Sequence, residues 1–262
     1  MPVVKIENHA GDLKKTETLS CTVLSRAGVS VTRQEQIVRE HFLEISVNGS
    51  FLARLSCTPS DLAELVLGRL LTERIIDGTE EVERIFICGR GDIAEVYLKK
   101  DIDLDIWKGT EPTCCTGNIQ LLLRRNGREL KELKASSVDE KCVFELAEYL
   151  KKDMELHRST GGAHNSYLRM PGGGVRGFED ISRHNALDKA AGYMLANAME
   201  PSECILFTSG RIAADIAVKA IAAGVPVLIS KAAPTEEAVR LAKRYGLRIV
   251  GKAWPDSCTF FC

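Results

Sequence analysis

Residues 204–253 read CILFTSGRIAADIAVKAIAAGVPVLISKAAPTEEAVRLAKRYGLRIVGKA. Three short apolar runs, at 204–209, 225–230 and 247–253, alternate with two segments, 212–224 and 236–246, whose apolar residues recur at helical spacing. This alternation predicts parallel strands joined by right-handed helical crossovers. The C-terminal part of the chain is therefore expected to be a βαβαβ unit of the α/β class.

Ligands of open α/β sheets bind beyond the carboxyl ends of the strands. The predicted ends are 209–211, 230–235 and 251–256. Ser209, Gly210 and Arg211 lie where a strand turns into a helix, and backbone N–H groups and an arginine at such a turn suit a phosphate. Pro234 and Thr235 occupy the equivalent place in the next unit, where Thr235 can instead cap the helix.

The stretch from Ser159 to Gly192, STGGAHNSYLRMPGGGVRGFEDISRHNALDKAAG, is rich in groups that do chemistry. Its second half predicts a helix that begins near Ser182, with Asp180 before it and His184 and Asp188 on its first turns. This face suits a guanine or pterin edge, a proton donor or a simple helix cap. Two histidines without an acidic or cysteine ligand at metal spacing indicate that the stretch is not a metal site.

The first part of the chain predicts a β-rich region with one helix. Alternating patterns over 21–31 and 41–55 predict strands, and Asn48–Gly49 predicts a two-residue hairpin turn. A helix is expected from a cap at Thr58 or Ser60 to Ile76, ended by Asp77–Gly78. Further predicted elements are strands at 82–88 and 93–99 and a helix at 143–156. We expect residues 1–110 to be part of, or packed on, an α/β cofactor-binding domain of residues 111–262.

Composition excludes several classes of protein. The 262 residues carry a net charge of −1 and are 45% hydrophobic, so no overall basic field indicates nucleic acid or an anionic membrane as a partner. No apolar run is long enough to cross a bilayer. The N-terminus lacks the apolar core of a secretory signal, and a cytoplasmic location is expected.

Nine cysteines are present, and an odd number in a reducing compartment argues against a disulfide framework. Cys21, Cys57, Cys88, Cys142 and Cys204 lie in apolar or strand-like surroundings, and most of them are expected to be small buried hydrophobes. The pair Cys114–Cys115 lies instead in a segment that reads as a loop. It is a candidate nucleophile or sulfur carrier, redox pair or soft-metal ligand.

Several motifs occur in one order along the chain. They are EISVNG (44–49), TPSD (58–61), LVLG (65–68), TGGAH (160–164), EDISRHNALDK (179–189), SGR (209–211), AGVP (223–226) and APT (233–235). In these motifs the chain resembles the FdhD/NarQ family of formate dehydrogenase accessory sulfurtransferases.

The resemblance implies a cytidine-deaminase-like three-layer α/β fold and a homodimer. It implies a protein that takes persulfide sulfur from a cysteine desulfurase and passes it to the molybdenum or tungsten cofactor. That cofactor, bis-molybdopterin guanine dinucleotide, is then inserted into formate dehydrogenase. Cys115 matches the sulfur-carrying cysteine of the family best, with Cys114 as the second choice.

Together, the strand ends and the resemblance predict a set of residues that bind the cofactor as cargo, with a guanine nucleotide as a related ligand and no structural metal. They are Gly161, Gly162, His164, Glu179, Asp180, Arg183, His184, Asn185, Asp188, Lys189, Ser209, Gly210, Arg211, Pro234, Thr235, Lys252, Ala253, Trp254, Pro255, Asp256 and Ser257.

The chain departs from the family pattern at several places. It has CCTGN at 114–118 where the family has C-G-x-C-G or G-C-G-G-G, and GKAWP at 251–255 where the family has G-F-x-R. Ser182 replaces a glycine, and Ala213 and Asp215 replace a serine and a glutamate. An alternative function is therefore a cofactor-binding chaperone that holds a guanine nucleotide or molybdopterin without transferring sulfur. A third is a deaminase, although the H-x-E and P-C-x-x-C zinc signature is absent.

Overall fold

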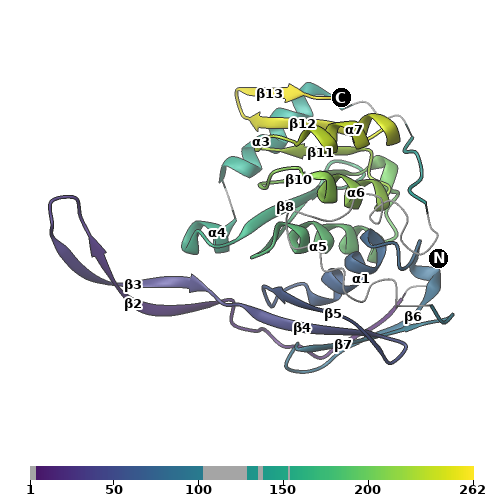
Figure 1. Cartoon of the computed structure of the whole chain (residues 1–262), viewed down its shortest axis with the longest axis horizontal. Helices are drawn as coiled ribbons and strands as arrows, with labels where there is room; N and C mark the ends of the chain where they lie inside the picture. Colours follow the sequence, from purple (N-terminus) through teal and green to yellow (C-terminus); the bar gives the residue numbers. More distant parts are fainter. Residues whose placement is uncertain (1–3, 103–128, 135–137, 153) are drawn as a thin grey trace.

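The computed structural model describes residues 4–102, 129–134, 138–152 and 154–262. Two large sheets lie at opposite ends of the body, and helices lie between them (Figure 1). The Cys114–Cys115 pair and the predicted boundary between residues 110 and 111 are outside the described residues, so both remain predictions.

The larger sheet has six strands in the order β13-β12-β11-β10-β8-β9. Its three central strands are parallel and are joined through two helices, which confirms the predicted βαβαβ unit. The elements are β8 (His164–Arg169), β9 (Val175–Asp180), β10 (Ile205–Thr208), α6 (Ala214–Ala222), β11 (Val227–Ser230), α7 (Glu236–Tyr245), β12 (Arg248–Trp254) and β13 (Ser257–Phe260).

Helices cover both faces of this sheet. Consecutive strand residues point to opposite faces, and in β10 and β11 the residues on both faces are buried. Phe207 and Ile229 pack in one cluster with Val143 of α3 (Glu140–Lys152). Leu206 and Leu228 belong to the other cluster, with α5 (Arg183–Ala196), α6 and α7. The result is a three-layer α/β arrangement, and the predicted α/β class is confirmed.

The smaller sheet is formed by the N-terminal region and has the order β1-β6-β7-β4-β5. Asn48 and Gly49 have φ values of 47° and 78°, and they form the predicted hairpin turn between β4 and β5. The elements are β1 (Lys5–Asn8), β4 (His41–Val47), β5 (Ser50–Cys57), α1 (Leu62–Thr72), a 3₁₀ turn (Thr79–Glu81), β6 (Val82–Ile87) and β7 (Ile93–Leu98).

The predicted limits of α1 are wrong at both ends. The residue at the N-cap is Asp61, in a left-handed conformation, rather than Thr58 or Ser60. At the other end the helix stops at Thr72, because Arg74 also takes a left-handed φ of 59°. The N–H groups of Ile75 and Ile76 then turn back to the carbonyl of Leu70, which buries both side chains.

A long antiparallel ribbon, here called the arm, consists of β2 (Thr16–Leu24) and β3 (Ser30–Val38). It projects away from the body (Figure 1). The predicted single strand over 21–31 is wrong, because it spans the turn at the tip, where Ser25 and Val29 are hydrogen bonded.

Two further differences concern the middle of the chain. The helix predicted at 143–156 is divided between α3 and a short helix, α4 (Glu155–Thr160). The β8–β9 hairpin was not predicted, although its signal, Pro171 followed by three glycines between two alternating runs, is present in the sequence.

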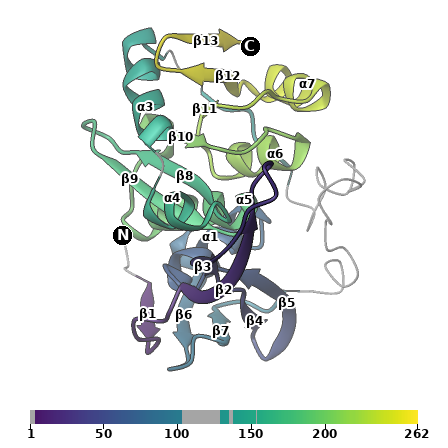
Figure 2. The same cartoon turned by 90° about the vertical axis from the view of Figure 1, so that its left-hand side faces the viewer.

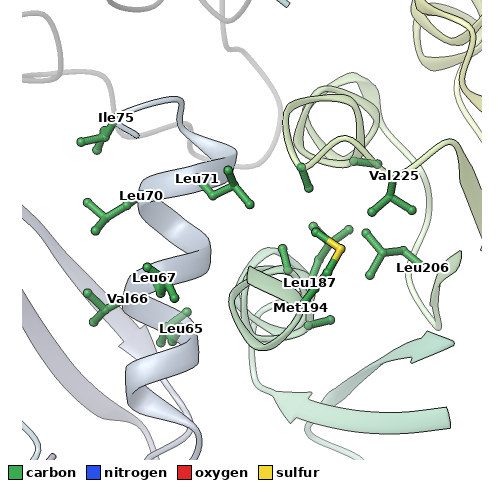
Figure 3. Close-up of a cluster of buried hydrophobic side chains, with 14 of the residues drawn as sticks. Leu65, Val66, Leu67, Leu70, Leu71, Ile75, Leu187, Met194, Leu206 and Val225 are labelled. Atoms are coloured by element: carbon green, nitrogen blue, oxygen red, sulfur yellow. The ribbon is translucent and has the colours of Figure 1, made fainter. Parts of the chain in front are cut away.

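Helices α1 and α5 cross in close backbone contact between the two sheets. A Cβ atom at Gly68 would lie 1.8 Å from the carbonyl oxygen of Asp188, and one at Gly192 would lie 1.8 Å from that of Glu64. Around the crossing, Leu67 and Leu71 of α1 and Leu187 of α5 belong to one buried cluster (Figure 3). The two glycines therefore set how closely the two halves of the chain approach.

Candidate functional site

The carboxyl ends of the three parallel strands form one continuous surface. The Ser230 hydroxyl donates to the Gly210 carbonyl at 2.7 Å, and the Thr235 N–H donates to the Ile212 carbonyl at 2.8 Å. The Lys252 N–H donates to the Ala232 carbonyl at 3.1 Å. The three predicted strand-end segments are therefore brought together.

The turn after β10 differs from the expected strand-to-helix turn. Helix α6 begins only at Ala214, and the Gly210 N–H donates to the Thr208 hydroxyl at 3.2 Å. Ser209 is also engaged, because its hydroxyl accepts from the Asn165 N–H at 3.0 Å. What this turn offers a ligand is the exposed side chain of Arg211, which makes no hydrogen bond or ion pair with a described residue.

Arg183, the first residue of α5, packs beside this turn. A Cβ at Gly210 would lie 3.1 Å from its Cδ atom, so only glycine admits the arginine without a shift. The guanidinium atoms Nε and Nη2 of Arg183 are buried and have no hydrogen-bond partner among the described residues. Buried donors are rarely left without a partner, and an anion such as a phosphate would satisfy both.

His164, at the start of β8, belongs to the same cluster. Burial lowers the pKa of its imidazole, and the nearby charges of Arg183, His157 and His184 lower it further. The ring is therefore neutral near pH 7. A bound anion would offset the positive neighbours and favour the protonated ring.

His184, one residue after Arg183, is paired with Asp215 of α6. The Nε2 and Oδ2 atoms are 2.6 Å apart. Burial raises the pKa of the Asp215 carboxyl, but the hydrogen bond and charge of His184 outweigh this effect and lower it. The pair borders a cavity of about 180 Å³ between the two halves, which Arg54, Arg69 and Lys219 also line.

Four predicted cofactor-binding residues are instead fully engaged inside the protein. Asp180 and Lys189 form an ion pair of 2.7 Å in which both side chains have no exposed area. Lys189 donates to the carbonyls of Thr58 at 3.1 Å and Glu179 at 3.0 Å. Asn185 donates to Asp180 and to the Ser56 carbonyl.

Asp188 makes a second buried ion pair, with Lys219 of α6, at 2.9 and 3.0 Å. Its Oδ1 atom also accepts from the hydroxyl of Thr72, at the end of α1. Asp180, Asn185, Asp188 and Lys189 thus tie α5 to the N-terminal region. Asp180, Asp188 and Lys189 have no solvent-exposed area.

Glu179 and the paired glycines shape α4 and its surroundings. The Glu179 carboxylate accepts from the N–H groups of Leu156 and His157, and so satisfies the start of α4. Gly161 ends the same helix with a φ of 65°. Gly162 lies against Val38 at the base of the arm.

Thr235 accepts from the Ala238 N–H at 3.3 Å and caps α7, as its helix-cap alternative predicts. Pro234 pairs with Ile212 through an isolated β-bridge.

The segment from Lys252 to Ser257 forms the turn from β12 into β13. Lys252 is exposed, with a left-handed φ of 50°, and Trp254 is 45% exposed. Ala253 is buried, and its side chain packs in the cluster beneath α3. Pro255, Asp256 and Ser257 complete the turn, so a cation and an aromatic ring lie at the same sheet edge as Arg211.

Lys219 and Thr72 are important partners that the site prediction did not include. Lys219 is 4% exposed on a helix whose other buried residues are apolar. A lone lysine on an apolar helix face is a signal that could have been read, because a buried ammonium group needs a carboxylate partner.

The cysteines of the described residues are free thiols. Cys57 and Cys204 are buried as predicted, and burial raises their pKa to about 12 and about 11. Cys21, Cys88 and Cys142 are only partly buried. The described residues contain no group of three potential metal ligands and no helix long and apolar enough to span a membrane.

Comparisons with known proteins agree on one family. A protein named "Sulfur carrier protein FdhD" from Halalkalibacterium halodurans is 34% identical to this chain over 229 residues, which cover 84% of each chain. A protein of the same name from Geobacillus kaustophilus is 33% identical over 233 residues, 86% of this chain and 88% of the relative.

A crystal structure of a protein described as a formate dehydrogenase accessory protein, from Desulfotalea psychrophila, superposes with a TM-score of 0.77. The identity is 22%, and the match covers 95% of this chain and 97% of the other, so it supports the fold. The sequence model of the FdhD/NarQ family matches residues 38–262. The chain therefore belongs to the FdhD/NarQ family.

Proposed function

We propose that this protein is a sulfur carrier that takes persulfide sulfur from a cysteine desulfurase and passes it to bis-molybdopterin guanine dinucleotide. The cofactor is cargo, and its recipient is formate dehydrogenase. The proposal is supported by family membership and by relatives that are named as sulfur carriers. We also propose a homodimer that works in the cytoplasm.

The observation that carries the binding part of the proposal is the pair of buried, unsatisfied guanidinium nitrogens of Arg183. They lie beside Gly210, at the same sheet edge as Arg211 and Lys252. Guanidinium groups and an ammonium group suit the diphosphate of a dinucleotide. The exposed indole of Trp254 offers a flat surface for a guanine or pterin ring.

The transfer step needs a thiolate. The Cys115 thiolate, or that of Cys114, attacks the terminal sulfur of the desulfurase persulfide; a new S–S bond forms, the donor S–S bond breaks, and the desulfurase leaves as a thiolate. Cys57 and Cys204 are poorly suited to this step, because burial raises the pKa of both thiols. The described cations then hold the cargo while the sulfur is delivered.

The test is incubation of the purified protein with a cysteine desulfurase and cysteine, followed by peptide mass spectrometry. We expect a peptide containing Cys114–Cys115 to gain about 32 Da, one sulfur atom, as a persulfide. Cys115→Ser is expected to abolish the gain, and Cys258→Ser serves as the matched control. An unlabelled Cys114–Cys115 peptide, under conditions that label an established carrier, contradicts sulfur transfer.

The altered CCTGN motif, which lacks a C-x-x-C spacing, favours one alternative: a chaperone that binds the cofactor without transferring sulfur. This alternative predicts guanine-nucleotide binding and complementation of formate dehydrogenase activity that both survive Cys114→Ala and Cys115→Ala. Loss of complementation with retained nucleotide binding selects the sulfur carrier.

A further inference from the structure

The arm exposes apolar side chains along one face. In the β2–β3 register, Glu17 lies opposite Ile37, Leu19 opposite Glu35, Cys21 opposite Arg33, and Val23 opposite Val31. These eight residues share one side of the ribbon, because side chains alternate along a strand. We call them the arm face.

The arm face differs from the reverse side of the same ribbon. Leu19, Val31 and Ile37 are 48%, 46% and 43% exposed, on a ribbon that projects from the body (Figures 1 and 2). The middle of the reverse side carries only uncharged polar residues: Thr18, Ser20, Thr22, Thr32, Gln34 and Gln36. Its apolar residues, Val38 and the exposed Leu24, lie at the two ends of the ribbon. Since an isolated two-stranded ribbon is marginally stable in water, its apolar side is expected to have a partner.

The charges on the arm face are arranged to match a copy of the same face. Arg33 and Glu35 lie on β3 at adjacent levels of the ribbon, between Val31 and Ile37 of the same strand. A two-fold axis that passes between these levels and runs across the ribbon places β3 antiparallel to its symmetry mate. Glu35 then faces Arg33 of the partner subunit, twice by symmetry, and Ile37 faces Val31 of the partner subunit.

We propose that the arm face binds the arm face of a second copy of this chain, with the two arms antiparallel. The inference rests on the homodimer proposed above, and it assigns that homodimer a surface. With nine residues in each strand, the overlap is ~30 Å long at the usual rise of a strand. The tip of one arm then lies at the base of its partner's arm, where β3 contacts α4.

Charge reversal tests the pairing directly, with the full-length protein analysed by sedimentation velocity and light scattering. In Arg33→Glu, every inter-arm pair becomes carboxylate against carboxylate; in Glu35→Arg, every pair becomes guanidinium against guanidinium. We expect each variant alone to raise the dimer dissociation constant about tenfold or more, because like charges then oppose each other twice. An equimolar mixture restores dimers, since opposite charges again face each other at both positions.

Gln34→Glu is the matched control, because it adds a charge to the same strand on the reverse side; it should leave the dimer intact. Val31→Glu tests the apolar contact and should weaken the dimer. Far-ultraviolet circular dichroism and thermal melting confirm that each variant is folded.

The outcomes separate the two proposals. A wild-type protein that stays monomeric at a protein concentration of tens of micromolar overturns both the arm contact and the homodimer. Such a result limits the free energy of dimerisation to roughly 6–7 kcal/mol. A wild-type dimer unaffected by Arg33→Glu and Val31→Glu overturns the arm contact and leaves the homodimer standing. Variants that lose the dimer but are not restored on mixing overturn the antiparallel pairing. Persulfide labelling is read separately and does not depend on any of these results.

Discussion

At the scale of single residues, the motif RHNALDK contains side chains that hold the protein together and one, Arg183, with donors left for a ligand. The spacing of the motif alone does not separate these two roles. Asn185, Asp188 and Lys189 are satisfied by internal partners. Arg183 instead has buried donors that no residue in the described part of the chain satisfies. The difference follows from direction: the satisfied side chains point into the junction between the two sheets, whereas Arg183 packs beside the strand-end turn at Gly210.

Replacing Arg183 should separate binding from stability. In Arg183→Met, we expect loss of two buried unsatisfied donors to leave the melting temperature unchanged or raise it. The same change should weaken binding of guanosine diphosphate by roughly 10- to 100-fold, the effect of losing charge-assisted hydrogen bonds. Calorimetric titration and thermal melting measure the two effects.

The matched control is Arg240→Met, which removes an exposed arginine on α7 that pairs with Glu236. It should leave nucleotide binding unchanged. Unaltered binding by Arg183→Met would show that the buried guanidinium does not hold the phosphate.

His164 should couple nucleotide binding to pH. Its folded pKa lies below the usual 6.5, so protonation opposes folding, and its contribution to stability is lost as pH falls from 6.5 through the folded pKa. A bound diphosphate favours the protonated ring. We therefore expect binding of guanosine diphosphate to strengthen between pH 8 and pH 6 in the wild-type protein.

The measurements are nuclear magnetic resonance titration of the His164 ring with and without nucleotide, and calorimetry across that pH range. His164→Gln should lose the part of the pH dependence that comes from this ring. A His164 pKa that nucleotide leaves unmoved contradicts its position beside the bound anion.

At the scale of elements, the crossing of α1 and α5 overrides helix propensity. Alanine usually stabilises a helix interior by about 1 kcal/mol relative to glycine. At Gly68 and Gly192, however, the added methyl group would overlap a backbone carbonyl of the facing helix. A backbone atom cannot move aside as the end of a flexible side chain can.

We expect Gly68→Ala and Gly192→Ala each to lower the free energy of unfolding by about 1–3 kcal/mol or more, the cost of overpacking a well-filled interior. Denaturant unfolding followed by circular dichroism measures the change. Gly11→Ala is the control, because no atom lies within 4 Å of its added methyl group. Wild-type stability in Gly68→Ala would contradict the close crossing.

At the scale of the whole molecule, two buried ion pairs tie the halves of the chain together. Asp180 and Lys189 are both hydrogen bonded to Thr58, between β5 and α1. Asp188 and Lys219 are both hydrogen bonded to Thr72, at the end of α1. Removing one member of a buried pair leaves an uncompensated charge.

Lys189→Met should therefore destabilise the protein by about 3–5 kcal/mol, whereas the double variant Asp180→Asn, Lys189→Met should recover part of that loss. Chemical unfolding of the two variants measures the difference. Exposed Lys5, which pairs with Glu7, provides the control Lys5→Met, with an expected change within about 1 kcal/mol. A double variant no more stable than Lys189→Met alone would show that the uncompensated charge is not the cause.

The sequence by itself determined the parallel βαβαβ unit, the Asn48–Gly49 hairpin and the start of α5 near Ser182, because each depends on local periodicity or turn chemistry. It also indicated the family, through motifs that stand in order along the chain. Only the tertiary structure decided which motif residues hold the protein together and which have free donors at the strand ends.

The same limit explains the errors at the ends of α1 and in the arm. Whether Arg74 ends a helix, or residues 25–29 turn back, depends on what the neighbouring segments pack against. Burial and hydrogen-bond partners come from segments far apart in the chain, such as Thr58 with Asp180 and Thr72 with Lys219. Local pattern therefore fixes the element, and long-range packing fixes the function of each side chain within it.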